Sequence, residues 1–130
     1  MSTSSTPDHT HIVLDRLHRL FGSRPADGRL GSKVDAAHAV ELVRDGATLL
    51  DVREREEWRS GHAPGALHIP LAQIDQAAGR LHQGRPVVVM CASGMRSRTA
   101  AKHLRGLGYD AASLSGGMSA WQRAGGEVRR

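Results

Sequence analysis

A short apolar run that ends at the only cysteine of the chain limits most strongly what this sequence can fold into. Residues 86–90 read Pro-Val-Val-Val-Met, a β-branched pattern typical of a buried strand. Small and polar residues follow from Cys91 to Ser97, and the pattern then predicts a helix from about Arg98 to Leu107. A strand, a loop and a helix in this order predict one unit of an α/β sheet, with Cys91 at the carboxyl end of its strand.

The same alternation of strands and helices continues along the rest of the chain. Asp35 is a favourable N-cap residue and predicts a helix that runs to Arg44 and stops at Asp45 and Gly46. Further strands are predicted at residues 48–52, 66–69 and 110–114, and further helices at residues 54–59, 74–81 and 119–124. This order predicts an α/β domain with a mainly parallel sheet, in which ligands gather at the carboxyl ends of the strands.

The N-terminal part of the chain differs in composition from the rest. Residues 1–10 are polar and rich in Ser and Thr, and residues 11–21 have the apolar periodicity of an amphipathic helix. Residues 22–31 contain Pro25, Gly28 and Gly31, which are typical of a linker. We therefore predict a flexible tail with a helical extension at residues 1–31 and one α/β domain at residues 32–130. Because short isolated helices are marginal in water, we expect the extension to dock on the domain, with partner binding as the alternative.

Charge and composition narrow the expected partners and compartment. The 18 Lys and Arg residues exceed the 13 Asp and Glu residues, but they are scattered and only 3% of the residues are aromatic, so no nucleic-acid partner is expected. One cysteine cannot form an internal disulfide, and no apolar run approaches the roughly 20 residues that cross a membrane. The N-terminus also lacks a secretory pattern, so we expect a cytoplasmic protein without a membrane partner. The histidines show no metal-ligand spacing, and we predict no metal and no cofactor.

The loop after the apolar strand has the composition of an anion-binding site with a nucleophile. A thiol at a helix N-terminus meets unpaired backbone N–H groups and the positive end of the helix dipole, which favour the reactive thiolate. Gly94 permits a backbone in which successive amides point inward, and Arg96 adds a fixed positive charge. The alternative is a structural cysteine at a strand end, but such a residue needs neither this loop nor an arginine.

Four segments of the chain together resemble the single-domain rhodanese-like sulfurtransferases. They are residues 51–54 (Asp-Val-Arg-Glu) with Glu57 and Trp58, residues 61–70 (Gly-His-Ala-Pro-Gly-Ala-Leu-His-Ile-Pro), residues 91–97 (Cys-Ala-Ser-Gly-Met-Arg-Ser), and residues 114–118 (Leu-Ser-Gly-Gly-Met) with Ala120 and Trp121. They occur in the order of the family and span almost the whole predicted domain. The resemblance implies a three-layer domain in which a mainly parallel sheet of about five strands is flanked by helices.

The resemblance also implies a reaction and a set of site residues. Cys91 is the implied nucleophile, which takes a sulfane sulfur from a small anion such as thiosulfate and passes the persulfide sulfur to a thiol or cyanide. A protein sulfur donor or acceptor is an open alternative. The implied substrate-binding residues are Ala92, Ser93, Gly94, Met95, Arg96 and Ser97 of the loop together with Arg53.

Several of these residues admit two interpretations. Arg96 either orients the anionic donor, which we expect, or braces the loop. Arg53 either reaches the anion or pairs with a nearby acid such as Glu54 or Asp51. Asp51 and His62 are expected to fix loops by hydrogen bonding, because a thiolate stabilised by amides needs no general base.

The remaining residues of the motifs are expected to be structural. Trp58 and Trp121 are predicted to be core aromatics, and Gly116 and Gly117 a tight turn before the last helix. Met95 is expected at the mouth of the pocket, where it would make access partly apolar.

The length of the loop separates rival functions. Four residues stand between Cys91 and Arg96, whereas cysteine phosphatases, including those with this fold, place five residues between cysteine and arginine. A phosphatase or arsenate reductase is therefore a secondary hypothesis. A third hypothesis is a rhodanese-like binding or redox-sensing module in which Cys91 acts as a sensor.

Overall fold

A computed structural model describes residues 29–130, so the tail, the predicted extension helix and most of the linker lie outside the described residues. In chain order the elements are β1 (Lys33–Val34), α2 (Ala36–Arg44), β2 (Thr48–Asp51), α3 (Arg55–Ser60), β3 (Leu67–His68), η1 (Leu71–Gly79), β4 (Val87–Met90), α4 (Met95–Gly106), β5 (Ala111–Leu114) and α5 (Gly117–Arg123). This alternation confirms the predicted α/β class.

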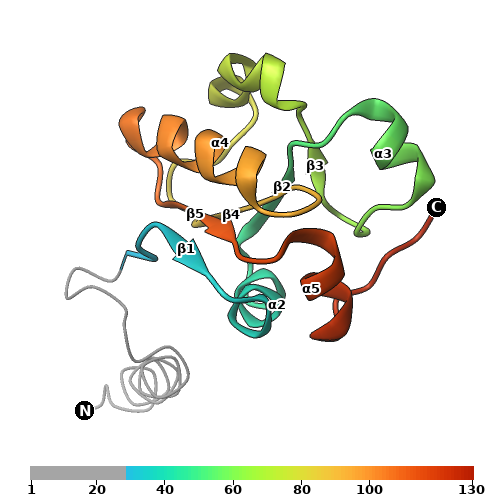
Figure 1. Cartoon of the computed structure of the whole chain (residues 1–130). Coiled ribbons are helices and arrows are strands. Elements are labelled where there is room, and N and C mark those ends of the chain that lie inside the picture. Colours follow the sequence, from blue (N-terminus) through green and yellow to red (C-terminus); the bar gives the residue numbers. More distant parts are fainter. Residues whose placement is uncertain (1–28) are drawn as a thin grey trace, which may run out of the picture.

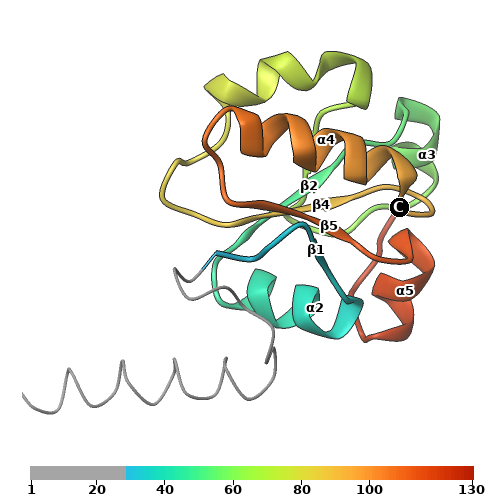
Figure 2. The same cartoon turned by 60° about the vertical axis from the view of Figure 1, so that its left-hand side comes forward.

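The five strands form one parallel sheet in the order β1-β5-β4-β2-β3. Helices α2 and α5 pack together below the sheet in Figure 1, whereas α4 and η1 pack together above it (Figures 1 and 2). The expected three-layer arrangement is therefore confirmed. Strand β4 lies in the centre of the sheet and is buried on both faces, which explains why it is a continuous apolar run rather than an alternating one.

Successive residues of β4 supply the two halves of the core. Val88 and Met90 belong to the apolar cluster on the side of α2 and α5. Val87, Val89 and Cys91 belong to the cluster on the side of α4 and η1. The period-two geometry of a strand thus directs the Cys91 side chain toward the N-terminus of α4.

The ends of β2 and β4 lie side by side at the carboxyl edge of the sheet. Asp51 is in register with Met90, and Val52 N–H donates to the carbonyl of Met90 at 2.9 Å. The loop that follows β2 therefore runs beside the loop that follows β4, as predicted for a parallel sheet. Helix α3 is part of the segment that follows β2.

Some local predictions differ from the structure. The helix after Cys91 begins at Met95 rather than near Arg98, because Gly94 takes a left-handed conformation (φ of 111°) and starts the helix without a side-chain cap. The segment predicted as a helix at residues 74–81 is a 3₁₀ segment at Leu71–Gly79, and the two-residue strand β1 is an element that the sequence pattern does not predict. The N-cap role of Asp35 is confirmed, since its carboxylate accepts from His38 N–H at 2.8 Å.

The two tryptophans have different environments. Trp121 is buried, as expected, and its indole N–H donates to the carbonyl of Glu127 at 3.0 Å. The prediction that Trp58 lies in the core is wrong: it is half-buried and stacks on two histidine rings, His62 at 3.7 Å and His68 at 4.6 Å between ring centroids. The six-residue helix α3 has no buried residue, so it rests on the domain through such contacts rather than through a core-facing stripe.

Candidate active site

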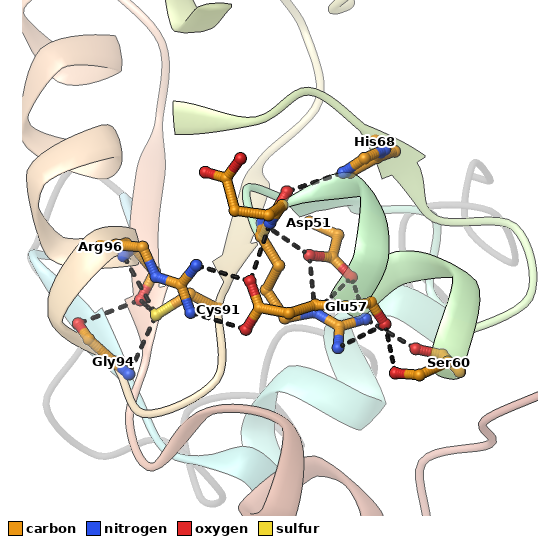
Figure 3. Close-up of polar contacts among 11 residues, drawn as sticks. Asp51, Glu57, Ser60, His68, Cys91, Gly94 and Arg96 are labelled. Atoms are coloured by element: carbon orange, nitrogen blue, oxygen red, sulfur yellow. Dashed lines mark hydrogen bonds and ion pairs between the residues drawn. The ribbon is translucent and has the colours of Figure 1, made fainter. Parts of the chain in front are cut away.

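The sulfur of Cys91 lies in a cradle made by its own loop, residues 91–97, here called the Cys91 loop. The backbone N–H groups of Gly94 and Ser97 donate to Sγ at 3.0 and 3.3 Å, and the Ser97 hydroxyl lies 3.6 Å from Sγ (Figure 3). Cys91, Gly94 and Ser97 are all buried. The loop therefore provides the inward-pointing donors that the sequence predicted.

Gly117, at the turn between β5 and α5, packs closely against the backbone of the Cys91 loop. A Cβ on Gly117 would lie 2.1 Å from the carbonyl oxygen of Ala92 and 2.7 Å from that of Cys91, so only glycine fits there. Met118 N–H also donates to the Cys91 carbonyl at 3.0 Å. The Gly116-Gly117 turn is thus structural, as expected, and its position fixes the backbone on which the sulfur sits.

Hydrogen bonding lowers the pKa of Cys91. Burial of the thiol by itself raises the pKa, because a charge is less stable away from water. The hydroxyl and the backbone N–H of Ser97, with the backbone N–H groups of Gly94 and Ser93, outweigh this effect and bring the pKa below the ordinary thiol value. The site therefore favours the nucleophilic thiolate.

A second buried hydroxyl supports Ser97. Ser113, on β5, is 1% exposed, and its Oγ lies 2.7 Å from the Oγ of Ser97. The Ser97 hydroxyl also donates to the carbonyl of Gly94 at 3.1 Å. Because Ser113 can donate to the Ser97 oxygen, the Ser97 hydrogen is free to turn from this carbonyl to a negatively charged sulfur. No sequence pattern pointed to Ser113, since it comes 16 residues after the loop serine.

Arg96 belongs to the Cys91 loop and its charge interacts with that of Cys91, but its guanidinium pairs with a carboxylate from α3. Its two terminal nitrogens donate to the two carboxylate oxygens of Glu57 at 2.7 and 2.9 Å (Figure 3). The hydrogen bonds from Arg96 hold the pKa of Glu57 at about 2, and Glu57 in turn raises the pKa of Arg96. The sequence predicted that Arg96 orients an anionic donor or braces the loop and did not point to Glu57, although Glu57 belongs to one of the four motif segments.

Arg53 is the second arginine predicted at the site, and it is nearly fully buried. Its guanidinium donates to both carboxylate oxygens of Asp51 at 2.8–3.1 Å and to the Gly61 carbonyl at 2.7 Å. Asp51 is itself fully buried and also accepts from the backbone N–H of Arg53. Of the two interpretations left open by the sequence, the structure contains the pairing with Asp51; Glu54 is instead the N-cap of α3.

His62 and His68 connect the loops around the site. A ring nitrogen of His62 lies 2.8 Å from the carbonyl of Trp58, and one of His68 lies 2.7 Å from the carbonyl of Arg53. The backbone of His62 also pairs with Arg129 near the C-terminus. His62 thus has the contacts expected of a bracing residue, and His68 is a further one that the sequence did not single out.

The rim of the Cys91 loop is open to solvent. Ala92 and Ser93 are exposed, and Met95 is 68% exposed. None of the helices in residues 29–130 has the length and apolar character needed to cross a membrane. Within the same residues no cluster of three or more His, Cys, Asp or Glu side chains is arranged to hold a metal ion.

Comparison with known proteins identifies the family. The model of the rhodanese-like domain matches residues 35–124, which include every motif segment and most of the chain. The chain belongs to the rhodanese-like family. A rhodanese-related protein of Thermoplasma volcanium has a similar structure, with a TM-score of 0.69 and 30% identity over 75% of this chain and 97% of that chain.

Two curated relatives contain a region similar to this rhodanese-like chain. A Bacillus subtilis protein named as a putative sulfur carrier, YrkF, is 39% identical over 47% of this chain. The HTH-type transcriptional regulator Rv0324 of Mycobacterium tuberculosis is 35% identical over 74% of this chain. The matched regions amount to 33% and 45% of the length of these relatives.

Proposed function

We propose that this protein is a sulfurtransferase that carries a sulfane sulfur as a persulfide on Cys91. The observation that carries the proposal is the cradle around Sγ, in which two backbone N–H groups and one hydroxyl meet a thiol whose pKa they lower. The family and the sulfur-carrier relative support a function in sulfur transfer.

In the first half-reaction, the Cys91 thiolate attacks the outer sulfur of an anionic donor, for which thiosulfate is the simplest test compound. A bond forms between Sγ and the outer sulfur while the bond to the sulfonate sulfur breaks, and sulfite leaves with the electron pair. The amides of residues 92–97 would then hold the terminal sulfur and stabilise its negative charge, as an oxyanion hole does.

In the second half-reaction, a thiolate or cyanide attacks the terminal sulfur of the persulfide. The S–S bond breaks, the Cys91 thiolate is released, and the acceptor becomes a persulfide or thiocyanate. Two such steps give ping-pong kinetics. The exposed rim at Ala92, Ser93 and Met95 supports this proposal, because an acceptor needs an open approach to the loop.

The proposal is tested by following both half-reactions on one preparation. Thiosulfate should release sulfite and add one sulfur to the wild-type protein, and cyanide should then remove that sulfur as thiocyanate. The Cys91→Ser variant should do neither. A wild-type protein that gains no sulfur from thiosulfate or from a persulfide would contradict the proposal, as would sulfur transfer by the Cys91→Ser variant.

A sensing function is the second candidate, because one relative is a transcriptional regulator that is similar to nearly three-quarters of this chain. A sensor shares the first half-reaction but keeps the persulfide. The rate of the second half-reaction separates the two functions. Multiple turnovers with a thiol acceptor support the transferase, whereas a persulfide that thiols remove only slowly supports the sensor.

A further inference from the structure

The carboxylate of Glu57 pairs with Arg96, the arginine that the sequence analysis expected to orient an anionic donor. Arg96 presents a planar fork whose two terminal nitrogens suit a carboxylate or a sulfonate equally well. In the structure both nitrogens donate to Glu57, at 2.7 and 2.9 Å (Figure 3), and the charge of Arg96 also interacts with that of Cys91. A sulfonate that binds the same two terminal N–H groups must therefore displace Glu57.

Glu57 is held in this position from its own helix. One of its carboxylate oxygens also accepts from the backbone N–H of Glu54 at 2.8 Å, which completes the capping box of α3. Its pKa of about 2 keeps it ionised at every pH at which the protein would work. Protonation therefore does not free Arg96, and an anion that competes for the same two nitrogens has to break a bidentate ion pair.

The other arginine predicted at the site cannot substitute for Arg96. Arg53 is 5% exposed, and its donors are directed to Asp51, to the Gly61 carbonyl and to the Glu57 carbonyl. A dianion such as thiosulfate would thus enter next to a thiolate and a carboxylate, with both arginine charges already balanced. An alkyl persulfide places at most one negative charge there, on the sulfur that the loop amides receive.

We propose that Glu57 is a specificity-determining residue that competes with sulfonate-bearing donors for Arg96 and thereby makes persulfides, R–S–SH, the preferred sulfur donors. This inference rests on the proposed sulfurtransferase function. In the reaction, the Cys91 thiolate attacks the outer sulfur of R–S–SH, a new S–S bond forms, and the original S–S bond breaks. R–S⁻ leaves with the electron pair, and Cys91 becomes the persulfide Cys91–S–SH. Cys91 is fully buried, so only the outer sulfur of the donor has to pass the exposed rim of the Cys91 loop to reach Sγ.

The test compares the two donor classes in the Glu57→Gln variant. The probes are thiosulfate and hydroxyethyl persulfide, the latter made in place from hydroxyethyl disulfide and sulfide, with cyanide as the acceptor. The amide oxygen of the introduced glutamine can still accept from Glu54 N–H, but the side chain no longer balances the charge of Arg96. We expect the ratio of kcat/KM for thiosulfate to kcat/KM for the persulfide to rise about tenfold, the size of one charge-assisted hydrogen bond.

Two further variants show whether the effect passes through Arg96. Glu56→Gln removes the neighbouring exposed charge of α3, and it should leave the ratio within about twofold because surface charges are screened. In an Arg96→Gln background, Glu57→Gln should no longer raise the ratio, because the arginine for which Glu57 and the sulfonate would compete is absent. Thermal unfolding of each variant confirms that the comparison is made between folded proteins.

The outcomes separate the inference from the proposed function. A ratio that stays constant in the Glu57→Gln variant would mean that Glu57 does not compete with the donor, and a ratio that falls would mean that Glu57 positions Arg96 for it. In either case the inference would be wrong while the sulfurtransferase function stands. A rise that is equally large for Glu56→Gln, or that persists without Arg96, would also overturn it. If neither donor adds sulfur to wild-type Cys91, the proposed function itself fails.

Discussion

Replacement of Ser97 by alanine tests how the loop activates Cys91. The Ser97 hydroxyl is the foremost hydrogen-bonding contribution that lowers the thiol pKa, and the Ser97, Gly94 and Ser93 amides remain in the variant. A hydrogen bond to a charged group is worth about 1.5–3 kcal/mol. The Oγ–Sγ distance of 3.6 Å places this one at the lower end of that range. Since about 1.36 kcal/mol corresponds to one pKa unit, the thiol pKa should rise by about one unit.

The chain offers a direct assay for this shift. Cys91 is the only cysteine, so the ultraviolet absorbance of the thiolate, followed against pH and corrected with the Cys91→Ser variant, reports this single group. Ser93→Ala is the matched control, because it removes an exposed hydroxyl from the same loop and keeps every amide. A thiol pKa that is unchanged in Ser97→Ala, or that shifts equally in Ser93→Ala, would refute the assignment of thiolate stabilisation to Ser97.

Three further predictions concern the support of the site. Asp51→Asn breaks a buried ion pair and leaves Arg53 uncompensated, which should lower the free energy of unfolding by roughly 3–5 kcal/mol in urea titrations; a loss under about 1 kcal/mol would contradict it. Because the folded pKa of Glu57, about 2, lies below its ordinary value of 4.5, its stabilising effect is complete above about pH 4.5 and is lost as the pH falls toward 2. Urea unfolding between these limits should therefore show a smaller loss in Glu57→Gln than in the wild type, and an equal loss would contradict this. Gly117→Ala should displace the Ala92 carbonyl and slow persulfide formation by more than about tenfold, whereas Gly125→Ala, at a glycine with open space around it, should not; equal rates of sulfur uptake in the two variants would count against this.

The sequence was sufficient to predict the fold because its strongest local patterns agree with the global arrangement. The apolar residues of β4, the Asp35 cap and the regular alternation of elements all specify a parallel α/β sheet. The elements that were missed or misplaced are those whose limits depend on tertiary contacts. Strand β1 has only two residues and exists through its pairing with β5, and the start of α4 depends on a left-handed glycine.

The candidate site could be predicted as a set of residues, but not as a set of pairs. The position of Cys91 and the inward amides follow from a strand–loop–helix pattern that is local in the chain. The partner of Arg96 is 39 residues away, and that of Ser97 is 16 residues away, so no local pattern could assign Glu57 or Ser113 to them. The size of Trp58 alone favours a core position, whereas its stacking partners at the surface are His62, in the loop after α3, and His68, on β3.

Intact-mass spectrometry of the wild-type protein and the Cys91→Ser variant, after incubation with thiosulfate or with hydroxyethyl persulfide, decides whether Cys91 carries sulfur. We predict that the wild type gains the mass of one sulfur atom, that cyanide removes it, and that the variant gains none. A wild type that stays unchanged with both donors, or a variant that gains the same sulfur, would contradict sulfur transfer through Cys91.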